Sequence, residues 1–330
     1  MLIAQDIHFS NIYNSPLTLN PALAGALNGS QRVNINYKNQ WKSMGAAYKT
    51  TAISYDLTLF RRKWPGSYIG AGLSVFNDKA GDSNLSMMNG SASLSGIVAL
   101  NNNNRLSTGM QFGIVQRTIK YEGLSWDNQF DGNVYDPSLP SGESIGGTKR
   151  NFMDLSSGIS WSYGTDESNI VSNNELRVNT GFAVYHINQP AQQFYQGNVD
   201  KLKMKYLFHS GANIGFPGTV VSMLPSVVII EQGKLREITF GTLFRYMINE
   251  ESRRTGLVQE KAILLGGYYR FKDAFIFSTM FEIYDFSIGF TYDLNISGLT
   301  KATKGNGGIE ISMRYTNSSH LGTKPTLRFL

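Results

Sequence analysis

Apolar and polar residues alternate with a period of two over most of this chain, in segments about ten residues long. Between 105 and 114, Leu106 and Phe112 belong to an apolar set, whereas Arg105 and Gln111 belong to the opposite, polar set. The same alternation recurs at 52–59, 153–163, 237–248, 285–294 and 307–316. Because successive side chains of a β-strand point to opposite faces, the pattern predicts strands with one apolar and one polar face.

About fourteen such strands can be assigned, a number within the range of transmembrane β-barrels. We expect them at 30–39, 47–59, 67–77, 85–99, 105–116, 151–163, 174–187, 204–216, 218–231, 235–248, 257–271, 274–283, 285–296 and 307–316. With both chain ends in the periplasm, the long connections at 117–150, 188–203 and 297–306 all fall on the extracellular side, as is usual for such barrels. The predicted fold is therefore all-β: a transmembrane antiparallel β-barrel of about 14 strands with a short N-terminal plug segment.

A soluble β-sandwich is the alternative fold, and the composition of the two faces argues against it. The polar face is rich in Gly and Ser and holds charged residues that we expect to pair inside a barrel: Asp56, Arg105, Asp154, Arg177, Arg245, Glu282, Asp293, Glu310 and Arg314. The apolar face carries aromatic residues near strand ends, where membrane interfaces favour them: Tyr48, Trp161, Tyr163, Tyr246, Tyr292 and Tyr315. Charged residues make up 16% of the chain, below the roughly 25% that is usual in soluble domains.

The stretch from Gln5 to Gly25 departs from this alternation. Its two prolines each remove a backbone donor, which excludes a strand. A single helical turn is expected from Pro21 to Leu23, with Asn20 as its N-cap. We therefore divide the chain into a leader and plug segment at 1–29 and a barrel at 30–330, the plug closing the barrel from the periplasmic side. Residues 1–4 are compatible with the tail of a secretory signal. The residues of the expected plug motif are Asn14, Pro16, Asn20, Pro21, Ala22 and Gly25.

The sequence offers no constellation of catalytic or metal-binding residues. It contains 4 histidines and no cysteine, and no pair of histidines has the spacing of metal ligands. We therefore expect a protein that is not an enzyme and that has no catalytic residues, cofactor or metal site. The net charge is +6, but the basic residues are dispersed, which argues against nucleic acid as a partner.

Aromatic residues gather in two of the long extracellular connections. They are candidates for binding a protein partner, because exposed aromatic side chains are common anchors at interfaces. The alternative is that they only fold the connections down over the mouth of the barrel. The candidate residues are Tyr121, Trp126, Phe130, Tyr135, Phe194 and Tyr195.

Short motifs spread along the chain carry a resemblance to a known family. They are Asn-Ser-Pro-Leu at 14–17, Asn-Pro-Ala-Leu-Ala-Gly at 20–25, Tyr-Lys-Asn-Gln-Trp at 37–41, Asn-Asp-Lys-Ala-Gly at 77–81, His186 with Gln-Pro at 189–190, Gly-Tyr-Tyr-Arg at 267–270, Tyr-Asp-Leu at 292–294 and Glu-Ile-Ser at 310–312. Through them the chain resembles the PorP/SprF family, outer-membrane barrels of the type IX secretion system and gliding machinery of Bacteroidetes-type bacteria. Lys38 departs from the arginine expected at that position.

The resemblance implies a non-enzymatic role in the outer membrane. It implies that the barrel, in contact with outer-membrane lipid, binds and anchors a secreted surface protein through that protein's C-terminal signal domain, alongside other type IX secretion or gliding components. The competing function is a solute channel like the fatty-acid channels, which also have about fourteen strands and an N-terminal hatch. A channel for apolar ligands needs a continuous apolar path, and the small and charged inward face expected here argues against one.

Overall fold

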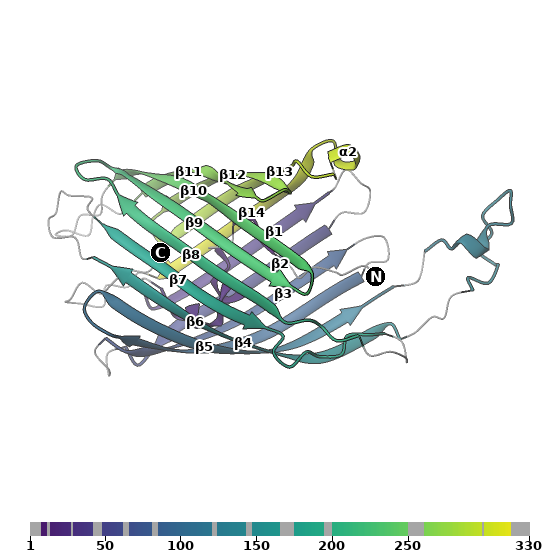
Figure 1. Cartoon of the computed structure of the whole chain (residues 1–330), viewed down its shortest axis with the longest axis horizontal. Coiled ribbons are helices and arrows are strands. Elements are labelled where there is room, and N and C mark those ends of the chain that lie inside the picture. The colour runs from purple at the N-terminus through teal and green to yellow at the C-terminus, as the bar shows by residue number, and fades with distance from the viewer. Residues whose placement is uncertain are drawn as a thin grey trace.

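A computed structural model of the chain describes residues 8–11, 14–27, 29–41, 48–61, 66–80, 85–120, 124–142, 147–165, 175–194, 200–249, 261–298 and 300–317. These residues form a closed barrel in which every strand pairs antiparallel with its neighbours in sequence, and the first strand pairs with the last (Figure 1). The prediction of an all-β antiparallel barrel is confirmed.

Fourteen strands lie in the described part of the chain, the number that the alternation predicts. They are β1 (Gln31–Gln40), β2 (Tyr48–Leu59), β3 (Tyr68–Ala80), β4 (Leu85–Ala99), β5 (Asn104–Thr118), β6 (Lys149–Gly164), β7 (Leu176–Tyr185), β8 (Lys205–Gly215), β9 (Val221–Gln232), β10 (Leu235–Asn249), β11 (Lys261–Arg270), β12 (Ala274–Ile283), β13 (Phe286–Asn295) and β14 (Asn306–Asn317). Among these residues, no helix is long and apolar enough to cross a membrane.

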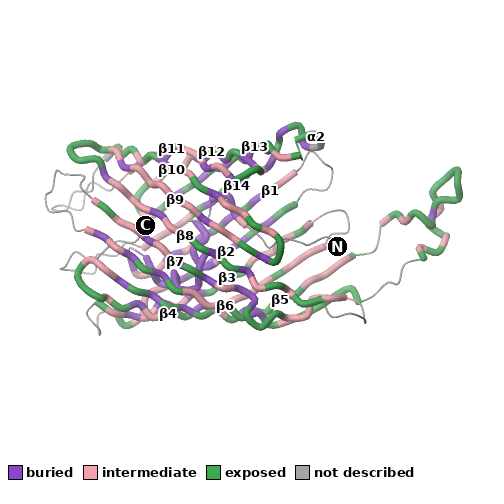
Figure 2. The backbone as a smooth tube through the Cα atoms, in the orientation of Figure 1, coloured by how far each residue is buried: buried purple, intermediate pink, exposed green. Residues whose placement is uncertain are grey.

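Burial follows the alternation along most strands (Figure 2). In β13 the exposed set includes Phe286 and Phe290, and the buried set includes Ser287 and Asp293. Exposed apolar residues and buried polar ones are the reverse of a soluble protein and are what a barrel in lipid requires. The expectation that Tyr48 lies on the outward, apolar face is wrong. Tyr48 has the same parity along β2 as the inward Thr50, and its ring packs edge-on against that of Trp41, with ring centroids 5.0 Å apart.

The two ends of the barrel differ in their connections. Residues 124–142, in the connection from β5 to β6, stand out from one end of the barrel, where α2 (Thr300–Thr303) also lies (Figure 1). Every connection at the opposite end is shorter than the one from β5 to β6, and the one between β12 and β13 is a tight turn, in which Tyr284 has a φ of 59°. Since long connections face outward in outer-membrane barrels, we call the first end the outer end and the second the periplasmic end.

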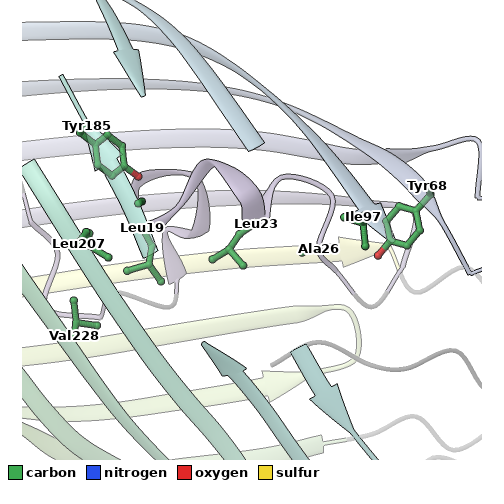
Figure 3. Close-up of a cluster of buried hydrophobic side chains, with 9 residues drawn as sticks. Leu19, Leu23, Ala26, Tyr68, Ile97, Tyr185, Leu207 and Val228 are labelled. Carbon is green, nitrogen blue, oxygen red and sulfur yellow. The ribbon is translucent and has the colours of Figure 1, made fainter. Parts of the chain in front are cut away.

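Residues 8–11 and 14–27, called the N-terminal segment from here on, lie inside the barrel (Figure 1). The segment contains two single turns, α1 (Pro16–Leu19) and η2 (Pro21–Leu23), the second of which is the turn expected from the sequence. Its Leu19, Leu23 and Ala26 form one apolar cluster with residues of the barrel wall (Figure 3). The wall residues of this cluster are Tyr68, Ile97, Ala183, Tyr185, Leu207 and Val228.

A second apolar cluster is made by inward residues of the wall alone. It contains Leu243, Ala262, Leu264, Tyr268, Ile276 and Met280, from β10 to β12. The expectation that the whole inward face is small and charged is therefore wrong over these strands. The sequence pattern fails here because neighbours such as Leu264 and Leu265 are both apolar, although one is buried and the other exposed.

Candidate functional site

The N-terminal segment is fixed to the barrel wall at its periplasmic end by an ion pair. Arg32 of β1 contacts Asp56 of β2, with 2.7 Å between Nη2 and Oδ2, and both side chains are buried. The guanidinium also donates to the backbone oxygens of Leu23 and Ala26, at 3.2 Å and 3.3 Å. The backbone N–H of Gly25 donates to Asp56 Oδ2 at 2.8 Å. The pair thus satisfies backbone groups of the segment that would otherwise be buried without partners.

Asn20 connects the centre of the segment to strands on the other side of the barrel. Its Oδ1 accepts from the backbone N–H of Ala22 at 2.9 Å, which makes it the N-cap of η2. Its Nδ2 donates to the backbone oxygen of Ile159 in β6 at 3.0 Å and lies 3.1 Å from His209 Nε2 in β8. One buried side chain therefore both shapes the turn and fixes its position against the wall.

The wall makes room for the backbone of this turn with a glycine. A Cβ atom at Gly109 in β5 would lie 2.5 Å from the oxygen of Pro21 and 2.6 Å from the nitrogen of Ala22, both backbone atoms that cannot move independently. Any other residue at Gly109 would therefore displace either the segment or the strand. Gly25, just after the turn, has a φ of 66°, which glycine adopts without strain.

Asn14 and Pro16 begin the first turn of the segment. The Nδ2 of Asn14 donates to Ser312 Oγ in β14 at 2.7 Å, and Asn36 Nδ2 in β1 donates to the backbone oxygen of Asn14 at 3.2 Å. Pro16 occupies the first position of α1, where its missing N–H costs nothing. The six residues of the expected plug motif thus all lie in the segment and are buried.

Charged side chains of β1, β11, β13 and β14 surround the start of the segment, toward the outer end of β1. Glu310 accepts from the backbone N–H groups of Ser10 and Asn11, at 2.6 Å and 3.2 Å. Asp293 accepts from Ser10 Oγ at 2.8 Å and lies 3.3 Å from Arg270. Lys38 donates to the backbone oxygen of His8 at 3.1 Å. The segment therefore extends from the periplasmic end past the middle of the lumen.

The expected network of inward charges divides into separate groups. Arg245 contacts Glu282 at 2.8 Å, and Glu282 contacts Arg314 at 3.6 Å. Asp154 pairs with Nδ1 of His186 at 2.9 Å, and Asp56 pairs with Arg32. Sequence reasoning did not single out Arg32, Lys38 and Arg270 as inward charges. The signal was present, since Arg32 and Lys38 share the parity of the inward Asn34 and Asn36.

The second candidate region is the outer hairpin, residues 124–142 of the connection from β5 to β6. Gln129 is its buried centre: its Nε2 donates to the backbone oxygen of Leu139 at 2.9 Å, and its Oε1 accepts from the hydroxyl of Tyr135 at 3.1 Å. Phe130 and Tyr135 form an isolated bridge. Figure 1 shows the hairpin standing clear of the barrel mouth, which disfavours the alternative that its aromatic residues cover the lumen.

Two aspartates close the turns of the outer hairpin. Backbone N–H groups of Val134 and Asn133 donate to Asp131 and hold the pKa of this carboxyl below its ordinary value. The hydroxyl and backbone N–H of Ser138 lower the pKa of Asp136 in the same way.

The aromatic candidates do not form one surface. Phe130 is 55% exposed and Tyr135 is 39% exposed, whereas Trp126, which precedes η4 (Asp127–Gln129), is half-buried. Phe194 lies at the barrel, with its ring centroid 5.8 Å from the guanidinium carbon of Arg117. Tyr121 and Tyr195 lie outside the described residues. The structure therefore places three of the six candidates on the outer hairpin and one at the mouth of the barrel.

Comparison with known proteins adds a family and a set of related folds. A family model described as type IX secretion system membrane protein PorP/SprF matches residues 2–315. No curated protein matches the chain. Among solved structures, the toluene transporter TbuX of Ralstonia pickettii has a TM-score of 0.51 at 9% identity, over 93% of this chain and 94% of that one. The toluene transporter TodX of P. putida has a TM-score of 0.44 at 12% identity, over 90% and 92%. The first likeness is one of fold, and the second is too weak to support a conclusion.

Proposed function

Because the chain belongs to the PorP/SprF family of type IX secretion system membrane proteins, we propose that it binds a secreted surface protein at the outer end of the barrel. The bound part is the C-terminal signal domain of that protein, and the binding anchors the protein at the cell surface. The role is non-enzymatic. Other type IX secretion and gliding components of a Bacteroidetes-type outer membrane are the expected neighbours of the complex.

The outer hairpin is the observation that carries this proposal. It presents Phe130, Val134 and Tyr135 as exposed apolar side chains, on a turn whose backbone is held by Asp131 and Gln129. An apolar surface on a prearranged backbone loses little conformational entropy on binding, which favours affinity. The outer hairpin that carries these residues stands away from the barrel wall (Figure 1), so their exposure is not explained by burial in the membrane.

The occupied lumen supports the same proposal. The N-terminal segment crosses it, and Leu17, Asn20 and Ala22 are fully buried there. A channel for solutes would first have to displace this segment from the ion pair of Arg32 and Asp56 and from the contacts of Asn20. The likeness to the toluene transporter TbuX is one of fold alone, and it does not favour the channel over docking at the outer end.

Binding of a purified signal domain to the purified barrel tests the proposal. The signal domain is taken from a surface protein that the same cell exports through the type IX system, and the Kd is measured in detergent. Truncating a central interface aromatic residue typically costs about 2 kcal/mol or more, or roughly 30-fold in Kd. We expect Trp126→Ala and Phe130→Ala to reach this range, while heat-modifiability on gels shows that the barrel is still folded.

Phe216→Ala is the matched control. Phe216 is 39% exposed in the turn between β8 and β9 at the periplasmic end, so the same chemical change should leave the Kd unaltered. An unchanged Kd after replacement of 124–142 by a Gly/Ser linker would contradict docking at this hairpin.

A further inference from the structure

Two lysines lie directly opposite each other on the outside of the barrel. Lys49 in β2 and Lys79 in β3 are register partners at the outer end of these strands. Both are exposed, and they alternate with the inward Thr50 and Asp78. Residues paired in this way have Cβ atoms about 4.5–5.5 Å apart in an antiparallel sheet, and two like charges at that distance repel.

No acidic side chain relieves this repulsion in the described part of the chain. Neither lysine forms an ion pair or a side-chain hydrogen bond with a described residue. Asp78, the nearest carboxylate in sequence, is turned to the other face, where it accepts from Thr50 Oγ1 at 2.6 Å. The outward neighbours of the pair along the same row are Asn39 of β1 and Ser86 of β4, which are neutral. The row therefore offers two cations and hydrogen-bonding groups to a ligand outside the protein.

The rows below the lysines show what kind of ligand fits. Toward the middle of the membrane, the next row has Tyr37, Thr51 and Asn77, and the row after it has Ile35, Ile53 and Val75. The three apolar side chains are 36%, 51% and 45% exposed. Apolar, then amphipathic, then cationic rows follow the order of acyl chains, interface and head groups in a bilayer leaflet.

We propose that Lys49 and Lys79 together bind the phosphate of a phosphorylated lipid in the outer leaflet. A phosphate placed between the two ammonium groups accepts hydrogen bonds from both and replaces their repulsion by attraction. The acyl chains of the same lipid lie along Ile35, Ile53 and Val75. A free phosphate ion could bind the two lysines in the same way, but it has no acyl chains to contact the apolar side chains. The proposed occupant is therefore the lipid.

Native mass spectrometry of the purified barrel with lipid A, a lipid carrying two phosphates, tests this site. The variant Lys49→Gln/Lys79→Gln should retain at least 10-fold less of the lipid than the wild type, whereas Lys49→Arg/Lys79→Arg should retain it. Lys234→Gln is the matched control, because Lys234 is exposed at the same end, between β9 and β10, and should leave retention unchanged. Equal retention by the wild type and the double Gln variant would overturn the proposal.

The temperature of thermal unfolding is a second readout. If the two lysines only stabilised the barrel, the double Gln variant should unfold at a lower temperature than the wild type, whereas the proposal predicts the opposite in the absence of the lipid. In vesicles of zwitterionic lipid, the double Gln variant should unfold at the same temperature as the wild type or higher, because a repulsion has been removed. In vesicles containing lipid A, the wild type should gain more in transition temperature than the variant. Binding of inorganic phosphate that the double Gln variant loses, together with equal retention of lipid A and its dephosphorylated form, would show an ion site and overturn the assignment to a lipid.

Discussion

The N-terminal segment and the outer hairpin both lie outside the barrel strands, but their backbone polar groups find hydrogen-bond partners in different ways. The N-terminal segment has two isolated turns that are too short to be stable alone, and the wall supplies partners for its backbone through Arg32, Asp56 and Glu310. The outer hairpin makes its own contacts through Gln129 and Asp131 and remains exposed. The first is therefore part of the barrel's interior, while the second is a surface that can bind without disturbing the barrel.

Among the changes that test this contrast, Gly109→Val should cause the largest loss of stability. The new side chain meets the backbone of Pro21 and Ala22, and such overpacking costs about 1–3 kcal/mol. We expect urea unfolding to show this loss and planar-bilayer recordings to show ion conduction through the partly vacated lumen. Gly90→Val is the matched control, since a Cβ at Gly90 meets nothing within 4 Å. Equal effects of the two substitutions would mean that the wall is not fitted to the segment.

Asn20→Ala should have the next largest effect. It removes the N-cap of η2 and the hydrogen bond to the oxygen of Ile159, and losing a cap costs about 0.5–2 kcal/mol. The midpoint of urea unfolding should fall, while binding of the signal domain stays unchanged. A variant that lost binding but kept its stability would assign Asn20 to a partner interface instead.

Gln129→Ala should act on the outer hairpin only. The substitution removes hydrogen bonds to Leu139 and Tyr135, each worth about 0.5–1.5 kcal/mol. We expect faster proteolysis within 124–142 and weaker binding of the signal domain. The free energy of unfolding of the barrel should change by less than about 0.5 kcal/mol, as for surface sites generally. A loss of barrel stability comparable to that of Asn20→Ala would erase the contrast between the two regions.

A change of pH should have the smallest effect, and only on the stability of the outer hairpin. The pKa values of Asp131 and Asp136 are lowered by hydrogen bonds that require the charged form. Their stabilisation of the hairpin is therefore fully present above the ordinary carboxyl pKa, about 4, and is lost as the pH falls through the lowered values. Protection of the hairpin from an acid-active protease should stay constant from about pH 6 to 5 and decline below about 4. Asp131→Asn should flatten this decline, and a transition near neutral pH would contradict the assignment.

The strands were predictable because lipid imposes a strict contrast between the two faces. The alternation of Leu106 and Phe112 with Arg105 and Ser107 locates β5 without any structure. Where both faces are apolar, as around Leu264 and Leu265 in β11, the sequence does not distinguish inward from outward residues. The apolar cluster of β10 to β12 was missed for this reason.

The contacts of the N-terminal segment were less predictable than its turns. Asn20 as the N-cap of η2 is a local feature that its neighbours in sequence reveal. Its contacts with Ile159 and His209 depend on barrel closure, which brings residues 139 and 189 positions away to one point. No local sequence pattern predicts contacts between residues so far apart in the chain. The same is true of the hydrogen bond from the backbone N–H of Ser10 to Glu310.

The measurement that most directly tests the account is the Kd of the signal domain for two variants of the barrel. One variant lacks residues 8–27, and the other has 124–142 replaced by a Gly/Ser linker. Docking at the outer hairpin predicts that the first variant binds like the wild type and that the second loses binding at least 10-fold. Loss of binding in the first variant with normal binding in the second would place the partner in the lumen and contradict the account.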